Sequence, residues 1–168
     1  DSMLEDGKKL HAENPDYYYM NTDTKILCEY VLRPYLRQMT GESFIIDSEK
    51  KMSFTRDQLV EVLTYIKDCY DGGVFEPAED SATFKGQIHT NPKWMDGKFV
   101  FAYGPSSSIN LLMDAVPEAE CTVVQMPMAK DRINDGFFAD TPQYMTVNKN
   151  SEHVEEAVDF LNYFYNSA

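Results

Sequence analysis

The chain has 168 residues, of which 43% are hydrophobic and 13% aromatic, so it holds enough apolar material for one globular domain with a packed core. Its 15 Lys and Arg residues against 28 Asp and Glu residues give a net charge of −13. Such an acidic surface repels phosphate groups, which argues against nucleic acid or an anionic membrane surface as a partner.

The chain opens with a pattern that predicts a helix and then a buried strand. Residues 3–13 place apolar side chains among charges and end before Pro15, which favours a short helix. Residues 17–20 (Tyr-Tyr-Tyr-Met) form an aromatic run between turn-forming residues. Such a run is typical of a strand that is covered on both faces.

A longer helix and a hairpin are predicted next. Residues 21–23 (Asn-Thr-Asp) supply helix-start chemistry, and apolar residues then recur at helical spacing as far as Gly41. Pro34 must kink or divide this helix, because its ring clashes with a carbonyl one turn earlier. Residues 44–46 and 51–54 are short β-prone runs around a polar turn, which predicts two short strands.

The helix predicted from Arg56 has the clearest boundaries. Thr55 and Gln58 can form a capping box, in which each side chain bonds the exposed backbone amide of the other residue. Gly72 and Gly73 can end the helix, because glycine adopts the left-handed backbone conformation without steric cost. The stripe that we expect to face the core consists of Leu59, Val62, Leu63, Ile66 and Tyr70.

Short helices and strands alternate after this helix. Residues 74–87 are predicted to form a loop, and residues 91–97 a short helix with Asn at its N-cap, Pro in its first turn and Gly at its end. Residues 99–103 are an unbroken apolar run, which predicts a buried strand. The serines at 106–108 are expected to cap a helix that runs to about Val116.

Two more strands and a final helix complete the predicted order. Residues 121–126 and 143–147 are predicted strands, and the last helix begins at residues 150–151, with glutamates near its positive end. Its apolar stripe is Val154, Val158, Leu161 and Phe164. Helices that alternate with strands carrying continuous apolar runs indicate an α/β fold with a covered sheet.

The sequence holds few signals for catalysis or for a cofactor. It has no glycine-rich phosphate loop and no nucleophile elbow, and no two acids are singled out as a general acid–base pair. We therefore predict no catalytic residue and no cofactor. Cys28, Cys69 and Cys121 lack CxxC spacing, and we expect Cys28 and Cys69 to be buried on their helices.

No metal site is predicted. Residues 131–136 resemble part of a calcium loop, but Ile133 occupies a ligand position and Pro142 stands where a bidentate glutamate belongs. The three histidines are scattered and form no metal-binding pair: His11, His89 and His153.

Aromatic residues gather near the ends of the predicted elements, where they could stack on the C–H face of a sugar ring. Tyr18 and Phe137 are the candidates for this role, and Trp94 is expected to form a lid on its short helix. We assign three others to the core: Tyr17, Tyr19 and Phe99.

The order of these landmarks resembles a known family. Residues 94–101 (Trp-Met-Asp-Gly-Lys-Phe-Val-Phe), followed by Gly-Pro-Ser at 104–106, are similar to a stretch of the extracellular solute-binding proteins of ABC importers. Residues 123–128 resemble that family's strand with a P-x-P-like end, and residues 144–161 its strand and following helix. The likeness is to the maltose-binding-protein-like branch, family 1, and the helix at 56–73 fits it.

The resemblance implies one lobe of a periplasmic-binding-protein-like (type II) α/β fold, with a small mixed sheet flanked by helices. A full member has two lobes that close on a solute, here a sugar by the same comparison. Residues 1–168 would be one segment of it, with 1–130 mostly from the second lobe and 131–168 a strand and helix that return to the first. The implied partners are the solute, the missing first lobe and a membrane permease. The implied location is outside the cytoplasmic membrane, as a lipoprotein whose signal and anchor lie upstream.

The same resemblance places ligand-facing residues where predicted strands end, as expected for open α/β sheets. Serine stands at 106, where the family often has an aromatic residue, which leaves room for a smaller or more polar solute. A carbohydrate-active enzyme using Asp80 or Asp140 and a sensor or adhesion module remain alternatives. The ligand-facing positions carried over are Asn21, Asp23, Thr24, Gly104, Ser106 and Ser107.

Overall fold

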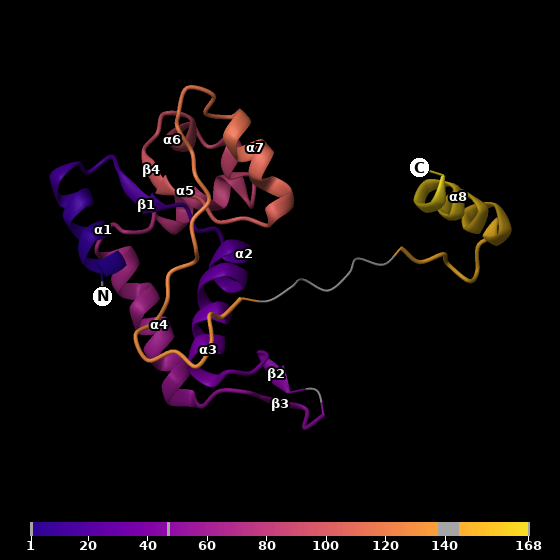
Figure 1. Ribbon diagram of the computed structural model, residues 1–168, viewed down its shortest axis with the longest axis horizontal. Coiled ribbons are helices and arrows are strands. Elements are labelled where there is room, and N and C mark those ends of the chain that lie inside the picture. The colour runs from indigo at the N-terminus through magenta and orange to yellow at the C-terminus, as the bar shows by residue number, and fades with distance from the viewer. Residues whose placement is uncertain (1, 47, 138–144, 168) are drawn as a thin grey trace. The chain divides into compact units, whose positions relative to one another are not determined.

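The computed structural model describes residues 2–46, 48–137 and 145–167, shown as ribbons in Figure 1. The chain divides into two units, Asp1–Phe138 and Ala139–Ala168. The first unit carries the elements from α1 (Ser2–Glu13) to α7 (Ile109–Asp114), and the second carries α8 (Val154–Asn166). In the described part of the chain, no helix combines the length and the apolar character needed to cross a membrane.

Two parallel strands form the centre of the first unit. β1 (Tyr18–Met20) pairs with β4 (Phe99–Phe101), with Tyr18 opposite Phe99 and Met20 opposite Phe101 (Figure 1). Phe75 adds a parallel bridge to Met20, so a third chain segment runs in the same direction. Both strands occur where they were predicted, and the α/β class is confirmed. The expected burial was wrong for β4, which is shorter than 99–103 and has Val100 and Phe101 exposed. Because the pairing is parallel, the carboxyl ends of these segments meet at one edge.

α1 packs against β1 and against the end of α4 (Arg56–Asp71). Glycines allow this close approach. A Cβ on Gly7 would lie 2.8 Å from a methyl carbon of Val74, and a Cβ on Gly73 would lie 2.0 Å from the His11 ring. Gly73 has φ +67°, so the left-handed helix ending that was predicted for Gly72-Gly73 is made by the second glycine.

α4 confirms its predicted boundaries. Thr55 Oγ1 accepts from the Gln58 amide and Gln58 Oε1 accepts from the Thr55 amide, which completes the capping box. Val62 and Ile66 are buried as expected. Leu63 is 46% exposed, so its place in the predicted core stripe was wrong. The buried face of α4 consists of Val62, Ile66 and the fully buried Cys69.

The helix predicted from 21–23 to Gly41 is divided at Pro34, as expected. It consists of α2 (Thr24–Ile26), a π-helical segment η1 (Leu27–Leu32) and α3 (Arg33–Thr40), and Gly41 ends it at φ +76°. Proline has no N–H to complete an α-helical turn. The turn before it widens, and the Arg33 amide reaches back to the Cys28 carbonyl.

The predicted hairpin is confirmed as β2 (Ile45–Ile46) paired antiparallel with β3 (Lys51–Met52). The prediction of a loop at 74–87 was wrong, because the helix α5 (Ala78–Phe84) forms within it. Pro77 stands at the N-cap of α5, and Glu79 and Asp80 lie near the positive end of the helix dipole.

The short helix α6 (Pro92–Met95) has Asn91 as its N-cap, as predicted, with Ile88–Thr90 (η2) before it. The prediction for 106–108 was wrong in one respect. Ser106–Ser108 forms a 3₁₀ turn (η3) that leads into α7, and no serine side chain caps the helix. The sharp turn after Pro105 already sets the start of the helix.

The strand predicted at 121–126 is absent. The segment has no regular secondary structure, no described strand pairs with it, and Val123 is 74% exposed. Apolar β-prone residues do not make a strand without a hydrogen-bonded neighbour. The strand predicted at 143–147 lies partly outside the described residues, and 145–147 have no regular structure. The predicted last helix is confirmed as α8.

The core of the first unit consists of three clusters. One holds Phe75 and Met20, a second holds Trp94 and Phe99, and a third joins α3 to α4. Trp94 is buried, and its Nε1 donates to the Leu112 carbonyl at 3.0 Å. Phe99 is core as predicted. Besides Leu63, Val100 and Phe101, two residues predicted to be buried have exposed side chains: Tyr17 and Cys28.

Residues 127–136 are fastened to α3 by the buried side chain of Gln38. Its Nε2 donates to the carbonyls of Pro127 at 3.0 Å and Asp135 at 3.1 Å. Its Oε1 accepts from the Ala129 amide at 2.7 Å. The Ile133 amide also donates to the Gln38 carbonyl at 2.7 Å, and Asn134 Nδ2 donates to the Gly41 carbonyl at 3.3 Å. These bonds together fix the course of the segment over the helix.

Candidate functional site

Polar residues gather at the carboxyl edge of the parallel strands. Asn21, Thr22 and Asp23 follow β1, Glu76 follows the bridge at Phe75, and Ala102 and Tyr103 follow β4. The Glu76 amide donates to the Met20 carbonyl at 3.1 Å, which holds two of these segments together. Open α/β sheets bind ligands at this edge.

Glu76 is the centre of a buried hydrogen-bond network that the sequence analysis missed. The residue is 1% exposed, and its Oε2 accepts from Asn21 Nδ2 and from Asn91 Nδ2 at 3.2 Å. Ser81 Oγ also donates to Oε2 at 3.0 Å, and Lys93 Nζ donates to Oε1 at 2.8 Å. The network ties the end of β1 to α5 and α6. The signal available in the sequence was the position of Glu76 directly after the buried apolar residues Val74 and Phe75.

Lys93 also bonds Asp80 Oδ2 at 3.0 Å, on the exposed side of the network. Partial burial lowers the pKa of Lys93, but the hydrogen bonds to Glu76 and Asp80 outweigh it and raise the pKa above its ordinary value. The lysine therefore remains charged and balances the buried carboxylate. Asp80, an acid considered for an enzymatic role, is engaged in this ion pair, and Asp140 lies outside the described residues.

Asp23 is buried and serves as the N-cap of α2. Its Oδ1 accepts from the Ile26 amide at 2.8 Å. Beside it, Tyr70 reaches the edge from α4, and its hydroxyl lies 2.8 Å from Thr22 Oγ1 and donates to the Thr22 carbonyl at 3.2 Å. Burial raises the pKa of Tyr70, and the negative charge of Asp23 adds to this shift. Thr24 is exposed.

Two aromatic rings stack next to this edge. The centroids of Tyr30 and Tyr103 are 6.4 Å apart with an interplanar angle of 27°. Burial raises the pKa of Tyr103 well above its ordinary value, so the phenol is neutral in the folded protein. Tyr18 lies instead beside His11, 4.8 Å between centroids, with Lys93 Nζ 5.2 Å from its ring.

The remaining predicted positions lie at the surface. Gly104, Ser106 and Ser107 are exposed on the turn after β4, and in the described part of the chain neither serine side chain makes a hydrogen bond to residues 21–23. Phe137 is 67% exposed, and its amide donates to Asp135 Oδ1 at 2.9 Å. The structure therefore brings Asn21 and Asp23 together with Glu76 and Tyr70, and leaves the others apart from this group.

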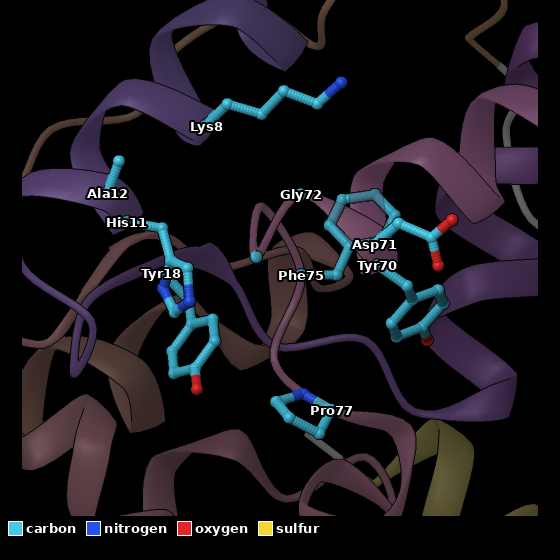
Figure 2. A pocket seen from close by; sticks show the side chains of 10 residues that line it. Lys8, His11, Ala12, Tyr18, Tyr70, Asp71, Gly72, Phe75 and Pro77 are labelled. Atoms are coloured by element: carbon cyan, nitrogen blue, oxygen red, sulfur yellow. The ribbon is translucent and has the colours of Figure 1, made fainter.

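A cavity of about 240 Å³ lies between α1, β1 and the end of α4. Figure 2 shows His11 and Tyr18 on one side of it and Tyr70 and Asp71 on the other. Tyr70 belongs to both places, because its ring lines the cavity and its hydroxyl bonds Thr22. In the described ranges, no three His, Cys, Asp or Glu residues are grouped so as to hold a metal ion.

Comparison with known proteins identifies the fold. No family model and no curated protein matches the chain. A crystal structure of a periplasmic solute-binding protein from Pectobacterium atrosepticum matches with a TM-score of 0.65 at 18% sequence identity. The match covers 99% of this chain and 42% of the other, so the chain spans less than half the length of that protein. The chain therefore has the α/β fold of part of a periplasmic solute-binding protein.

Proposed function

We propose that this chain is part of an extracytoplasmic receptor that binds a small solute at the carboxyl edge of its parallel strands. The observation that carries the proposal is the fold likeness over 99% of the chain, combined with polar side chains collected at that edge. Of the residues predicted from the sequence, we propose that those following β1 and β4 face the solute: Asn21, Asp23, Thr24, Gly104, Ser106 and Ser107. Tyr18 begins β1 at the opposite end, beside His11, and Phe137 lies apart, so neither is assigned to this edge.

The solute we propose is a carbohydrate. Tyr103 follows β4 as Asn21 and Asp23 follow the parallel strand β1, and its ring stacks on that of Tyr30. An apolar ring face and polar side chains at this edge would suit the C–H face and the hydroxyl groups of a sugar. The exposed serine at 106, in place of an aromatic residue, leaves space for a small sugar rather than a long chain. Within this proposal the chain belongs to a sugar receptor of the maltose-binding-protein-like branch.

Binding in this proposal involves no bond making or breaking. The missing first lobe, to which residues 131–168 would return, closes over the solute by a hinge motion, and the closed form is recognised by the permease of an ABC importer. Residues 1–130 would then supply one wall of the cleft. The receptor would work outside the cytoplasmic membrane, held there as a lipoprotein.

A thermal-shift screen of the full-length protein tests the proposal. Monosaccharides, disaccharides, peptides and polyamines are each added at high concentration, and the melting temperature is measured. A ligand at about 100 times its Kd stabilises the folded state by about 2.7 kcal/mol. We expect at least one sugar to give a saturable increase. The absence of any shift across the panel would refute solute binding, and a shift with peptides alone would refute the carbohydrate assignment.

A further inference from the structure

The two carboxylate oxygens of Asp23 have different environments. Oδ1 accepts from the Ile26 amide at 2.8 Å and caps α2. Oδ2 is buried and has no hydrogen-bond partner among the described residues, although Asp23 as a whole is only 5% exposed. A buried carboxylate oxygen without a donor has lost its hydration without replacement, which is unfavourable for the fold.

Glu76 shows that this edge of the sheet can satisfy a buried acid. Its oxygens receive hydrogen bonds from Asn21, Ser81 and Asn91, and Lys93 supplies a balancing charge. Asp23 stands on the same segment as Asn21, two positions further along the chain. The unpaired oxygen is therefore specific to Asp23 and is not a general property of acids in this region.

A strained turn lies against the same oxygen. A Cβ on Gly86 would be 3.5 Å from Asp23 Oδ2, so the Gly86 backbone passes directly beside it. Lys85, which ends α5, has φ +30° and ψ +65°, and Gly86 has φ +77°. Two consecutive left-handed residues, one of them not glycine, are unfavourable, and such strain concentrates at functional sites.

We propose that Asp23 Oδ2 is the acceptor for a hydrogen-bond donor of the solute, beside the Lys85–Gly86 turn. This inference rests on the proposed function and narrows the class of solute. The site then requires a solute with O–H or N–H groups, such as a polyol or an amine, and disfavours carboxylate anions without donors, which Asp23 repels.

The substitution Asp23→Asn separates the two oxygens. Asparagine is as good an N-cap as aspartate, so Oδ1 still accepts from the Ile26 amide, while an NH₂ donor replaces Oδ2. We expect the unliganded variant to melt at the same temperature as the wild type or higher. We expect its affinity for a bound sugar or amine to fall by about tenfold or more, as for a lost bond to a charged group. Asp114→Asn removes the same charge from an exposed position and should bind as the wild type does.

The measurement is a thermal-shift titration of the full-length protein with glucose, xylose, putrescine and succinate. A second variant, Asp23→Ser, keeps a capping oxygen and has no second acceptor, so it must show the same loss. Wild-type affinity in both variants would overturn the inference and leave solute binding intact. Stabilisation of the wild type by succinate alone would also overturn the inference, because succinate has no donor for Asp23 Oδ2. A clearly lower melting temperature of unliganded Asp23→Asn would overturn it as well, because Oδ2 would then have a stabilising role in the fold. No shift of the wild type by any probe would refute the proposed function itself.

Discussion

Buried polar side chains set the course of two segments that have little regular structure of their own. Glu76 joins the end of β1 to α5 and α6, and Gln38 joins α3 to residues 127–136. Each side chain is nearly inaccessible to water and makes several hydrogen bonds. Buried polar groups are costly when they lose a partner, so single substitutions at these positions should have large effects.

Replacing Gln38 by leucine tests whether the loss of one buried polar side chain destabilises the protein. The carbonyls of Pro127 and Asp135 and the amide of Ala129 lose their partner, and we expect a loss of about 2–4 kcal/mol of unfolding free energy. Trypsin should then cut faster at Lys130 and Arg132, which are exposed in the released segment. Denaturant titration and limited proteolysis measure the two effects.

Gln87→Leu makes the same chemical change at an exposed position and should leave stability and cleavage unchanged. If Gln38→Leu were digested at the wild-type rate under native conditions, the fastening of residues 127–136 by this side chain would be wrong.

The thiols should differ in reactivity. Cys69 is fully buried, and burial raises its pKa to about 11, so the reactive thiolate is scarce at pH 8. Cys28 is exposed. In a Cys121→Ser background, which removes the partly buried third thiol, we expect a thiol reagent at pH 8 to label Cys28 rapidly and Cys69 only after denaturation. Adding Cys28→Ser should then remove the fast phase. Labelling of Cys69 at the rate of Cys28 in the native protein would contradict its burial.

Elements with local boundary signals were predictable from the sequence, and those that depend on distant partners were not. The capping box at Thr55 and the proline-led helix at Asn91 are both decided by residues within a few positions. Residues 121–126 have β-prone side chains but no paired neighbour in the described chain, and pairing cannot be read from one segment. α5 was missed because its short sequence has no clear apolar stripe, and its buried residue is Ser81.

The close packing of α1 against the end of α4 can be tested by adding a side chain at the contact. Gly73→Ala and Gly97→Ala both place a side chain on a left-handed residue, at φ +67° and +68°, which costs about 1–2 kcal/mol. Only at Gly73 does the new Cβ collide, 2.0 Å from the His11 ring. We expect Gly73→Ala to be less stable than Gly97→Ala by roughly 1–3 kcal/mol in denaturant titrations.

His11 cannot move away freely, because its Nδ1 lies 2.9 Å from the Tyr17 carbonyl and its ring packs on Tyr18. Equal stability losses in the two alanine variants would show that α1 is not held in this position.

At the scale of the whole molecule, the sequence predicted which edge of the sheet carries the candidate site better than it predicted the residues gathered there. Parallel strands bring their carboxyl ends together, so the sequence alone could place Asn21 and Asp23 at one edge. It could not show that Glu76 and Tyr70 join them, because Glu76 follows the β-bridge at Phe75 and Tyr70 lies on α4. It also could not distinguish the two oxygens of Asp23, which depend on the fold around them.

The most direct test of the account is a map of backbone amide chemical shifts in the full-length protein, titrated with a solute that raises its melting temperature. We predict that the largest changes in this chain fall at residues 21–24 and 102–107 and beside Gly86. Changes confined to Lys8, His11, Gly72 and Gly73, which line the cavity between α1 and α4, would place binding elsewhere and contradict the proposed site.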